Sequence, residues 1–366
     1  MMEDKLLNDS LQNNSVPLFS GLDLLFDLKP LFVPLYAILV TVACAGNVLL
    51  ILLIVITKKL HNTTNFLIGN LAAADLVMCI FCVPLTVSYA FEVRGWLFGV
   101  FMCHFVTLMQ AATVFVSVLS LTAIAVDRYI VVAYPIRRRI SCRSCVYVVA
   151  FIWLVSIAVS VPTSIHTHYL DLNKIGHDMI ICEEFWKHQE KKRLFYSCSI
   201  LFLSYMLPLS AVCISYCAIS YHLRKRNVPG ASSSHNQEKW TKKKKKTFRM
   251  LIISVMAFAL SWLPLQVVNL IRDIDEEFIV LDKNYVNVVQ VSCHLVAMSS
   301  ACYNPFIYAS LHDKFRFHLN SYFYHHKRRA GTFSSKASRL NTCSTLVDNP
   351  VGITDKIILQ GRFSFN

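Results

Sequence analysis

Long apolar runs alternate with polar stretches along the 366 residues of the chain. Seven of these runs are long enough to cross a bilayer, and they cover positions 31–57, 65–91, 100–125, 145–165, 194–221, 249–271 and 285–311. A helix rises about 1.5 Å per residue, so about 20 apolar residues span the roughly 30 Å of hydrocarbon. Asp75 is the only acid inside the runs, as expected where a buried charge is costly. The pattern predicts an all-α membrane protein, a seven-transmembrane helix bundle.

The polar stretches divide the rest of the chain. A β-barrel is excluded because its strands are short and alternate apolar with polar residues, a pattern that these long apolar runs do not have. Residues 1–30 form a polar segment before the first span, and residues 31–311 form the transmembrane domain. Aromatic and aliphatic residues from Phe315 to Phe323 stand among lysines and arginines, which predicts an amphipathic helix over 312–326 on the bilayer surface. We expect a disordered tail over 327–366.

The charge of the chain sets its expected orientation. The formal net charge is +14, which on a soluble domain would suggest nucleic acid. Of the 36 Lys and Arg, however, 26 lie in the segments on the side of the C-terminus and 10 on the side of the N-terminus. The positive-inside rule then places the N-terminus outside the cell. We therefore expect no nucleic-acid partner, a basic face toward the lipid bilayer in the cytosol, and possible glycosylation at Asn8 and Asn13.

Short motifs occur at matching depths in the seven runs: Gly46-Asn47, Leu71-Ala72-Ala73-Ala74-Asp75, Asp127-Arg128-Tyr129, Trp153, Pro208 with Tyr216, Phe258 with Ser261-Trp262-Leu263-Pro264, and Asn304-Pro305-Phe306-Ile307-Tyr308. Taken together and in order, these motifs resemble those of the rhodopsin-like (class A) G-protein-coupled receptors. The resemblance covers residues 31–324. It implies a multi-pass plasma-membrane receptor that is not an enzyme, whose partners are a heterotrimeric G protein, arrestin and receptor kinases.

The resemblance also implies an activation switch in the inner half of the bundle. Its expected members are Asp127, Arg128, Tyr129, Tyr216, Phe258, Trp262, Pro264, Asn304, Pro305 and Tyr308. Arg128 is expected to pair with Asp127 in one state and to turn toward a partner in another. The alternative is that Arg128 only marks the membrane edge. The prolines remove helical hydrogen bonds and predict kinks at which the bundle can open.

Asp75 has no Lys or Arg at its depth. The family places a sodium ion at this position, and Ser117, Ser300 and Asn304 match the remaining ligands. Oxygen donors of this kind suit a hard cation. The alternative is a neutral acid that is hydrogen-bonded to Asn47 and has a structural role only. No other cofactor is expected.

The chain has 13 cysteines. Only Cys103 and Cys182 fall on the extracellular side in the expected orientation. Because the exterior is oxidising, these two are the candidates for a disulfide bond.

The residues in the outer half of the expected bundle indicate the class of ligand. Receptors for amines carry an Asp in the third span where this chain has Gln110, and the seventh run has no Lys for retinal. Acids ring the outer mouth instead, at Glu183, Glu184, Glu190, Asp273, Asp275, Glu276, Glu277 and Asp282. Such a field attracts a cationic ligand.

A finer resemblance involves residues 61–71, 89–96, 182–186 and 297–305. These stretches are similar to receptors for prolactin-releasing peptide, which stand beside the neuropeptide Y receptors and recognise a peptide ending in Arg-Phe-amide. The resemblance implies that Asp273 and Glu184 pair with the arginine of an extracellular amidated peptide. It places Gln110 and Trp186 at the amide end, with Asn269 as a further ligand-binding candidate.

Two alternatives remain open. The first, within the same family, is a receptor for a neuropeptide Y-like peptide ending in Arg-Tyr-amide. The second is a membrane transporter, which the lone intramembrane acid and the lack of internal repeats disfavour.

Overall fold

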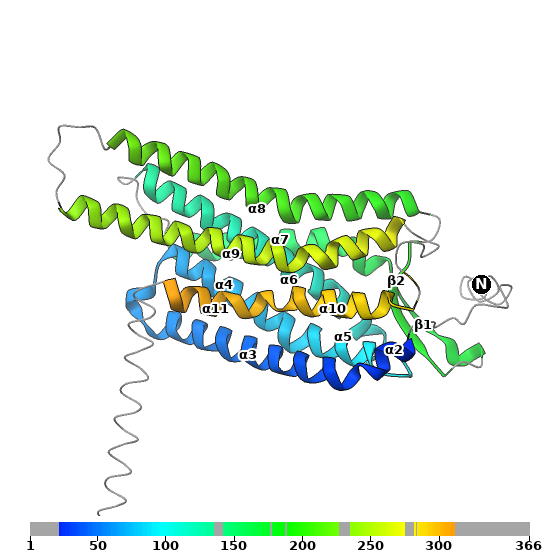
Figure 1. Cartoon of the computed structure of the whole chain (residues 1–366). Helices are drawn as coiled ribbons and strands as arrows, with labels where there is room; N and C mark the ends of the chain where they lie inside the picture. Colours follow the sequence, from blue (N-terminus) through cyan, green and yellow to red (C-terminus); the bar gives the residue numbers. More distant parts are fainter. Residues whose placement is uncertain are drawn as a thin grey trace, which may run out of the picture. The chain divides into compact units, whose positions relative to one another are not determined.

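A computed structural model describes residues 22–134, 142–175, 178–186, 189–226, 235–274, 282 and 284–311. Figure 1 shows its helices and one hairpin. The helices are α2 (Leu22–Asp27), α3 (Lys29–Ile56), α4 (Thr63–Val77), α5 (Val83–Ala90), α6 (Gly99–Ala133), α7 (Cys142–Ile165), α8 (Glu190–Arg226), α9 (His235–Ile274), α10 (Val286–Met298) and α11 (Ser300–Leu311). Short helical turns occupy Lys58–Leu60 and Leu172–Ile175, and the strands are β1 (Thr167–Asp171) and β2 (Ile180–Glu184).

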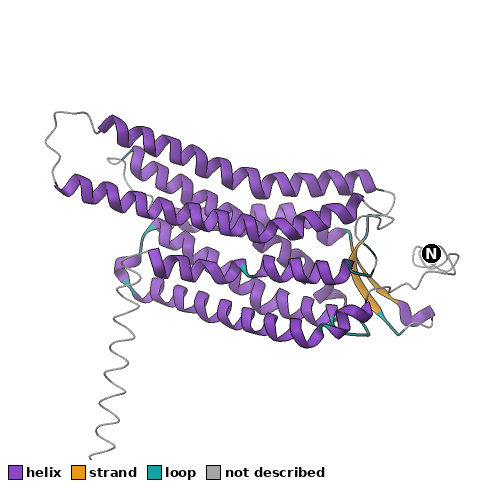
Figure 2. Ribbon diagram, viewed as in Figure 1, coloured by secondary structure: helices purple, strands orange, loops and turns teal. Residues whose placement is uncertain are grey.

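The helices pack side by side as a bundle around α6 (Figure 2). Helix α6 contacts α4, α7, α8 and α9, while α11 packs against α3 and α9. Most side chains buried along α6 are small or branched, among them Ala112, Val116 and Val118, and such residues let several helices approach one helix closely. Helix α6 is therefore the core element of the bundle.

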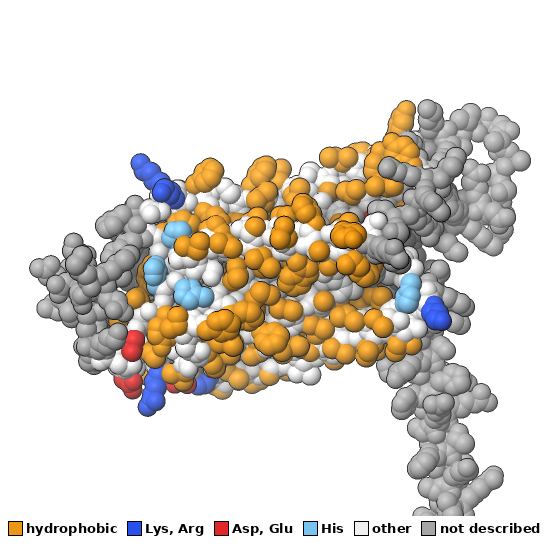
Figure 3. All heavy atoms as spheres, turned by 180° about the vertical axis from the view of Figure 1, so that it is seen from behind, with side chains coloured by type: hydrophobic (Ala, Val, Ile, Leu, Met, Phe, Trp, Pro, Cys, Tyr) orange, Lys and Arg blue, Asp and Glu red, His pale blue; other side chains and the backbone are white. Residues whose placement is uncertain are grey.

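The outward faces of the helices are apolar. Ile38, Phe101, Phe151 and Phe202 are all more than half exposed, and Figure 3 shows hydrophobic side chains across the middle of one face, with charged ones toward its ends. Exposed apolar surface on this scale marks contact with a nonpolar phase. Six of the described helical segments are long and apolar enough to cross a membrane. The seventh expected span is divided at Ser299 into α10 and α11.

The second span departs from a regular helix. Between α4 and α5, residues Met78–Cys82 form a π-helix in which the N–H of Val83 donates to the carbonyl of Met78. Pro84 follows at once, and a proline has no N–H to offer the preceding turn. The wide turn accommodates this loss, and π-turns of this kind often lie at functional sites.

Helix starts differ slightly from the apolar runs. Helix α3 begins at Lys29 and is preceded by α2, so part of the expected N-terminal segment is helical. Helices α8 and α9 extend well past the runs 194–221 and 249–271 into basic sequence. The expected helix over 312–326 and the tail lie outside the described residues.

Candidate functional site

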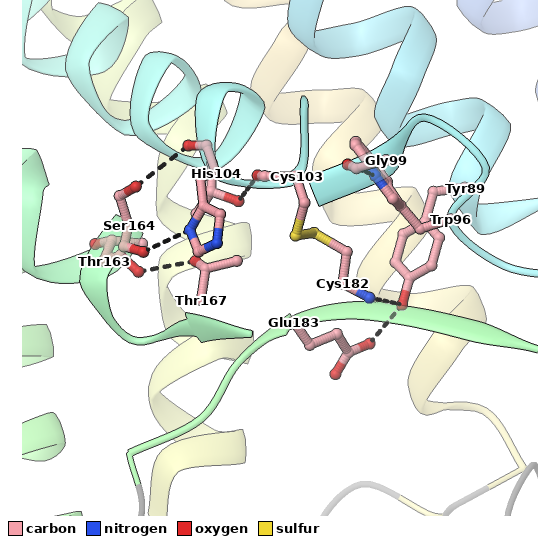
Figure 4. Close-up of a disulfide and its surroundings, with 11 residues drawn as sticks. Tyr89, Trp96, Gly99, Cys103, His104, Thr163, Ser164, Thr167, Cys182 and Glu183 are labelled. Atoms are coloured by element: carbon pink, nitrogen blue, oxygen red, sulfur yellow. Dashed lines mark hydrogen bonds between the residues drawn. A yellow bond between two sulfur atoms is a disulfide. The ribbon is translucent and has the colours of Figure 1, made fainter. Parts of the chain in front are cut away.

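The hairpin of β1 and β2 covers the end of the bundle at which α3 begins, which is the outer end in the expected orientation. The strands are antiparallel, with Thr167 opposite Glu184. Cys182 of β2 forms the expected disulfide with Cys103 at the start of α6, with their Cα atoms 5.9 Å apart. Figure 4 shows the disulfide beside Tyr89, whose hydroxyl accepts a hydrogen bond of 3.4 Å from the N–H of Cys182. The predicted pairing is confirmed.

The loop before α6 fastens the other edge of β2. The N–H of Trp96 donates to the carbonyl of Ile180 at 2.8 Å, and the N–H of Ile180 donates to that of Arg94 at 2.9 Å. Gly95 between them has a φ of 73°, and a side chain there would meet the Ile180 carbonyl. Only glycine fits this turn without strain. The hairpin is thus held by covalent and backbone bonds in a fixed position over the site.

Beside the hairpin, Asp273 near the end of α9 is bound on both oxygens. Its Oδ1 lies 2.6 Å from Nη2 of Arg193 on α8, and its side chain is only 5% exposed. Its Oδ2 accepts a hydrogen bond of 2.6 Å from Ser197, one turn further along α8. Sequence reasoning named Asp273 but missed both partners, although the spacing of four residues places Arg193 and Ser197 on one face of a helix.

Glu184 and Trp186 belong to the same group of residues as Asp273 and Arg193. We call these four residues the outer cluster. The indole Nε1 of Trp186 donates to the Glu184 carboxylate. The indole ring stacks on His166, with ring centroids 3.6 Å apart, and lies against Tyr196 at 5.5 Å. Burial raises the pKa of the Glu184 carboxyl, and nearby Asp273 raises it further, against lowering by the Trp186 hydrogen bond, Arg193 and His166. The two acids that sequence reasoning assigned to one ligand arginine therefore share one electrostatic environment.

Deeper in the bundle, Gln110 of α6 belongs to a chain of hydrogen bonds. Its Oε1 accepts from Thr86 at 3.3 Å, and its Nε2 lies 3.3 Å from Nε2 of His294 on α10. The other ring nitrogen of His294 is 2.9 Å from the Tyr36 hydroxyl, which donates to the carbonyl of Val291 at 2.9 Å. Because that hydroxyl has one proton, His294 carries its own proton on Nδ1 and accepts from Gln110 on Nε2. This series of hydrogen bonds fixes the orientation of the Gln110 amide.

Asn269, the remaining ligand-binding candidate, pairs with α10. Its Oδ1 accepts a hydrogen bond of 2.9 Å from Gln290. The Oε1 of Gln290 is buried without a hydrogen-bond partner among the described residues. A buried orphan acceptor costs about 1–3 kcal/mol, so a donor that reached it would be bound favourably.

At mid-depth, Asp75 is buried and accepts a hydrogen bond of 2.9 Å from Nδ2 of Asn304. Ser117 and Ser300 are buried as well. The alternative in which Asp75 is hydrogen-bonded to Asn47 is not observed, because the Asn47 amide donates instead to the carbonyls of Ala43 and Ala301. The oxygens of Asp75, Ser117 and Ser300 suit a hard cation in chemistry.

Trp262 connects this depth to α9. Its Nε1 donates to Ser300 at 3.1 Å, and its ring lies 6.0 Å from that of Phe258, one turn away. Pro264 and Pro305 stand inside α9 and α11 as expected, and Tyr308 is fully buried on α11. The structure thus joins α9 and α11 through Trp262.

At the inner end of α6, Arg128 is held by Asp127. Nη2 of Arg128 lies 2.6 Å from Oδ2 of Asp127, which also accepts a hydrogen bond of 2.7 Å from Thr64. Arg128 donates to the same Thr64 hydroxyl. Tyr129 packs edge-on against Tyr134. This is the paired arrangement expected for Arg128, with Thr64 as a partner that sequence reasoning missed.

Three expected residues are not placed above. Asn8, Asn13 and the side chain of Tyr216 lie outside the described residues.

Comparison with known proteins assigns a family that agrees with the arrangement of helices. A family described as "7 transmembrane receptor (rhodopsin family)" matches residues 46–308. The chain is 30% identical over 289 residues to the RYamide receptor of Drosophila melanogaster, which covers 78% of the chain and 61% of that receptor. It is 32% identical over 295 residues to neuropeptide Y receptor type 2 of Homo sapiens, and this alignment covers 80% of the chain and 76% of that receptor. The transporter alternative is thereby set aside, and the chain belongs to the rhodopsin family of seven-transmembrane receptors, which are not enzymes.

Proposed function

We propose that this multi-pass plasma-membrane protein is a receptor for an extracellular amidated neuropeptide of the RF-amide type, related to prolactin-releasing peptide, and that it activates a heterotrimeric G protein. The outer cluster carries the proposal. Glu184 and Asp273 lie close together with a shared field, which suits a cationic side chain. Gln110 lies deeper and is neutral, which suits a carboxamide rather than an amine.

The peptide's arginine would pair with Asp273 and Glu184, and its terminal amide would reach toward Gln110, with Trp186 and Asn269 lining the path. A primary amide both donates and accepts hydrogen bonds, as does the Gln110 side chain. A carboxylate terminus would lack the donor and would bring a charge into a neutral environment, so amidation should be required for binding.

The test is agonist-dependent nucleotide exchange in membranes that contain the full chain. A panel of amidated peptides ending in Arg-Phe-amide is compared with the same peptides as free acids. We expect exchange with the amides and at least a hundredfold weaker potency with the acids, an order of magnitude typical of a buried polar mismatch. Ion flux without nucleotide exchange would contradict the receptor function.

A second candidate is a receptor for a peptide ending in Arg-Tyr-amide. The similarity to an RYamide receptor and to neuropeptide Y receptor type 2 supports it. Peptides that differ only in the last residue, Phe or Tyr, distinguish the two proposals, because the pocket that accepts Phe pays to bury a hydroxyl without a partner.

We further propose that a sodium ion binds Asp75 with Ser117, Ser300 and Asn304 as an allosteric ligand. The observation in its favour is a buried carboxylate that receives one hydrogen bond, from Asn304, among the described residues. The ion would supply positive charge to that carboxylate. Arrestin and receptor kinases are proposed as partners of the cytosolic tail.

A further inference from the structure

The ion pair between Arg193 and Asp273 joins two helices at their outer ends. Arg193 is the fourth residue of α8, and Asp273 is the residue before the last of α9. A helix dipole disfavours a cation in the first turn and an anion in the last turn. Each charge therefore lies at the helix end that disfavours it, so neither charge stabilises its own helix. The favourable interaction of each group is the ion pair with the other.

The two partners differ in how freely they can move. The Asp273 side chain is 5% exposed and its Oδ2 is fixed by Ser197, whereas the Arg193 side chain is 36% exposed. If the pair opens, Arg193 can turn into water, but Asp273 stays buried as an uncompensated charge, which is costly. Asp273 therefore requires a cation, and Arg193 is the partner that can be replaced.

The charge count of the outer cluster leaves room for one more cation. Glu184 and Asp273 carry two negative charges against the one permanent positive charge of Arg193, all close enough to act on one another, and His166 acts on Glu184 as well. Trp186 donates to Glu184 but is neutral. A ligand guanidinium that entered this cluster would balance the second acid and would meet Arg193 as a competitor of the same chemistry.

We propose that Arg193 is an internal competitor of the ligand, a resident guanidinium that occupies Asp273 in the unliganded receptor and sets its affinity for cationic peptides. The proposal rests on the proposed function in one respect, namely that the ligand carries an arginine. It assigns Arg193 to specificity, because a ligand must bring a guanidinium good enough to replace the resident one, and a neutral side chain cannot do so.

The first experiment measures competition binding to the full receptor in membranes. The probes are a peptide ending in Arg-Phe-amide and its analogue in which citrulline, a neutral isostere, replaces that arginine. Removing the competitor by Arg193→Gln should raise affinity for the arginine peptide about fivefold, the factor equivalent to about 1 kcal/mol at 1.4 kcal/mol per tenfold. Affinity for the citrulline peptide should stay unchanged.

Three variants serve as controls. Lys192→Gln removes the same charge from the neighbouring, exposed position and should leave the ratio of the two affinities as in the wild type. Arg193→Lys keeps a cation and should also stay near the wild-type ratio. In an Asp273→Asn background, Arg193→Gln should have no further effect. An unchanged ratio in Arg193→Gln alone would overturn the proposal.

The second experiment separates this proposal from the peptide function. Purified receptor is melted with argininamide or citrullinamide, which need no peptide recognition. We expect argininamide to raise the melting temperature of Arg193→Gln more than that of the wild type, and citrullinamide to act equally on both. Equal argininamide shifts, including none in either protein, would overturn the competitor role. Failure of the peptides to bind the wild type, with a larger argininamide shift in the variant, would overturn only the peptide proposal.

Discussion

Thr64 joins both members of the Asp127 and Arg128 pair through one hydroxyl, which donates to Asp127 and accepts from Arg128. Thr64→Val keeps the shape of the side chain and removes this link. A hydrogen bond to a charged group contributes about 1.5–3 kcal/mol, so we expect at least a several-fold rise in ligand-free nucleotide exchange as Arg128 is released more often.

Thr122→Val is the matched control for this prediction. It lies on the same helix as Arg128, and its hydroxyl donates at 2.8 Å to the carbonyl of Val118 on its own helix. It should leave basal exchange unchanged. If Thr64→Val also had no effect while Asp127→Asn raised exchange, the hydroxyl would be shown to play no part in holding the pair.

Glu184 predicts a pH dependence of ligand binding. Its pKa is raised above the ordinary value of 4.5, with burial as the largest cause. A bound guanidinium favours the ionised carboxylate, so binding lowers this pKa and the affinity must fall as pH falls through the raised value. We expect affinity for a cationic peptide to weaken already in mildly acidic buffer, above the range in which an exposed Glu titrates.

The control for the pH series is Glu184→Gln. His166, Asp273 and Arg193 also act on this carboxyl, and all three are kept in the variant. The variant should bind more weakly at neutral pH and lose the portion of the pH dependence due to Glu184. An identical pH profile in the variant would contradict the assignment to Glu184.

Sequence reasoning found site residues that stand in motifs and missed those that act through distant partners. Asp127 and Arg128 are predicted from their motif and Asp273 from its place at the end of the sixth span, and the structure shows each of them paired. Gln110 was named as well, but its bond to His294 joins positions 184 residues apart. Arg193 was counted only as one base among many, because its significance arises from Asp273, which approaches it only when α8 and α9 pack.

At the scale of helices, Gly46 permits the close approach of α3 to α11. A Cβ at this position would lie 3.0 Å from Cγ of Pro305, whereas one at Gly69 would lie 3.9 Å from its nearest neighbour, Ile54. Both glycines are inside helices, so the helix-propensity change on substitution is the same. Gly46→Val should therefore destabilise the receptor by about 1–3 kcal/mol more than Gly69→Val, the usual cost of overpacking.

Thermal melting of the two purified variants measures this difference. We expect a clearly lower melting temperature for Gly46→Val and a small change for Gly69→Val. Equal melting temperatures would show that Pro305 moves aside at little cost and that the α3–α11 contact is loosely packed.

The disulfide is the element-scale constraint on the hairpin, and it closes a sequence separation of 79 residues. A loop of this length corresponds to about 4.5 kcal/mol in the chain-entropy account. Cys103→Ala with Cys182→Ala should lower the melting temperature and weaken ligand binding, since β2 carries Glu184. Labelling of both cysteines by a thiol reagent on intact, unreduced cells would contradict the bond.

Element boundaries could be predicted only in part. Seven apolar runs gave the number and order of spans because lipid demands length and apolarity, which are visible in sequence. The π-turn at Met78–Cys82 and the division at Ser299 were not predicted. Both depend on how backbone groups are shared across neighbouring turns and helices, which leaves no mark in hydropathy.

At the scale of the whole bundle, one helix connects the outer cluster to the inner half. Asp273 and Trp262 are on α9, 11 residues or about three turns apart, and Trp262 bonds to Ser300 of α11. A ligand that replaces Arg193 at Asp273 would loosen α9 from α8 at the outer end. The equilibrium between two packings of α9 would then shift, and with it the positions of Trp262 and Phe258. Ligand binding would in this way be allosterically coupled to the inner half of the bundle.

Orientation is the last property of the whole molecule to test, and charge predicts it. With 26 of 36 basic residues on the side of the C-terminus, the N-terminus should be extracellular. An N-terminal epitope should be detected on intact cells and a C-terminal one only after permeabilisation. Asn8→Gln with Asn13→Gln should remove any glycosidase-sensitive mobility shift. Asn62→Gln should not, because Asn62 lies on the opposite side, where its side chain caps α4 by accepting from the N–H of Asn65. A shift lost with Asn62 instead would invert the receptor and place the basic face outside.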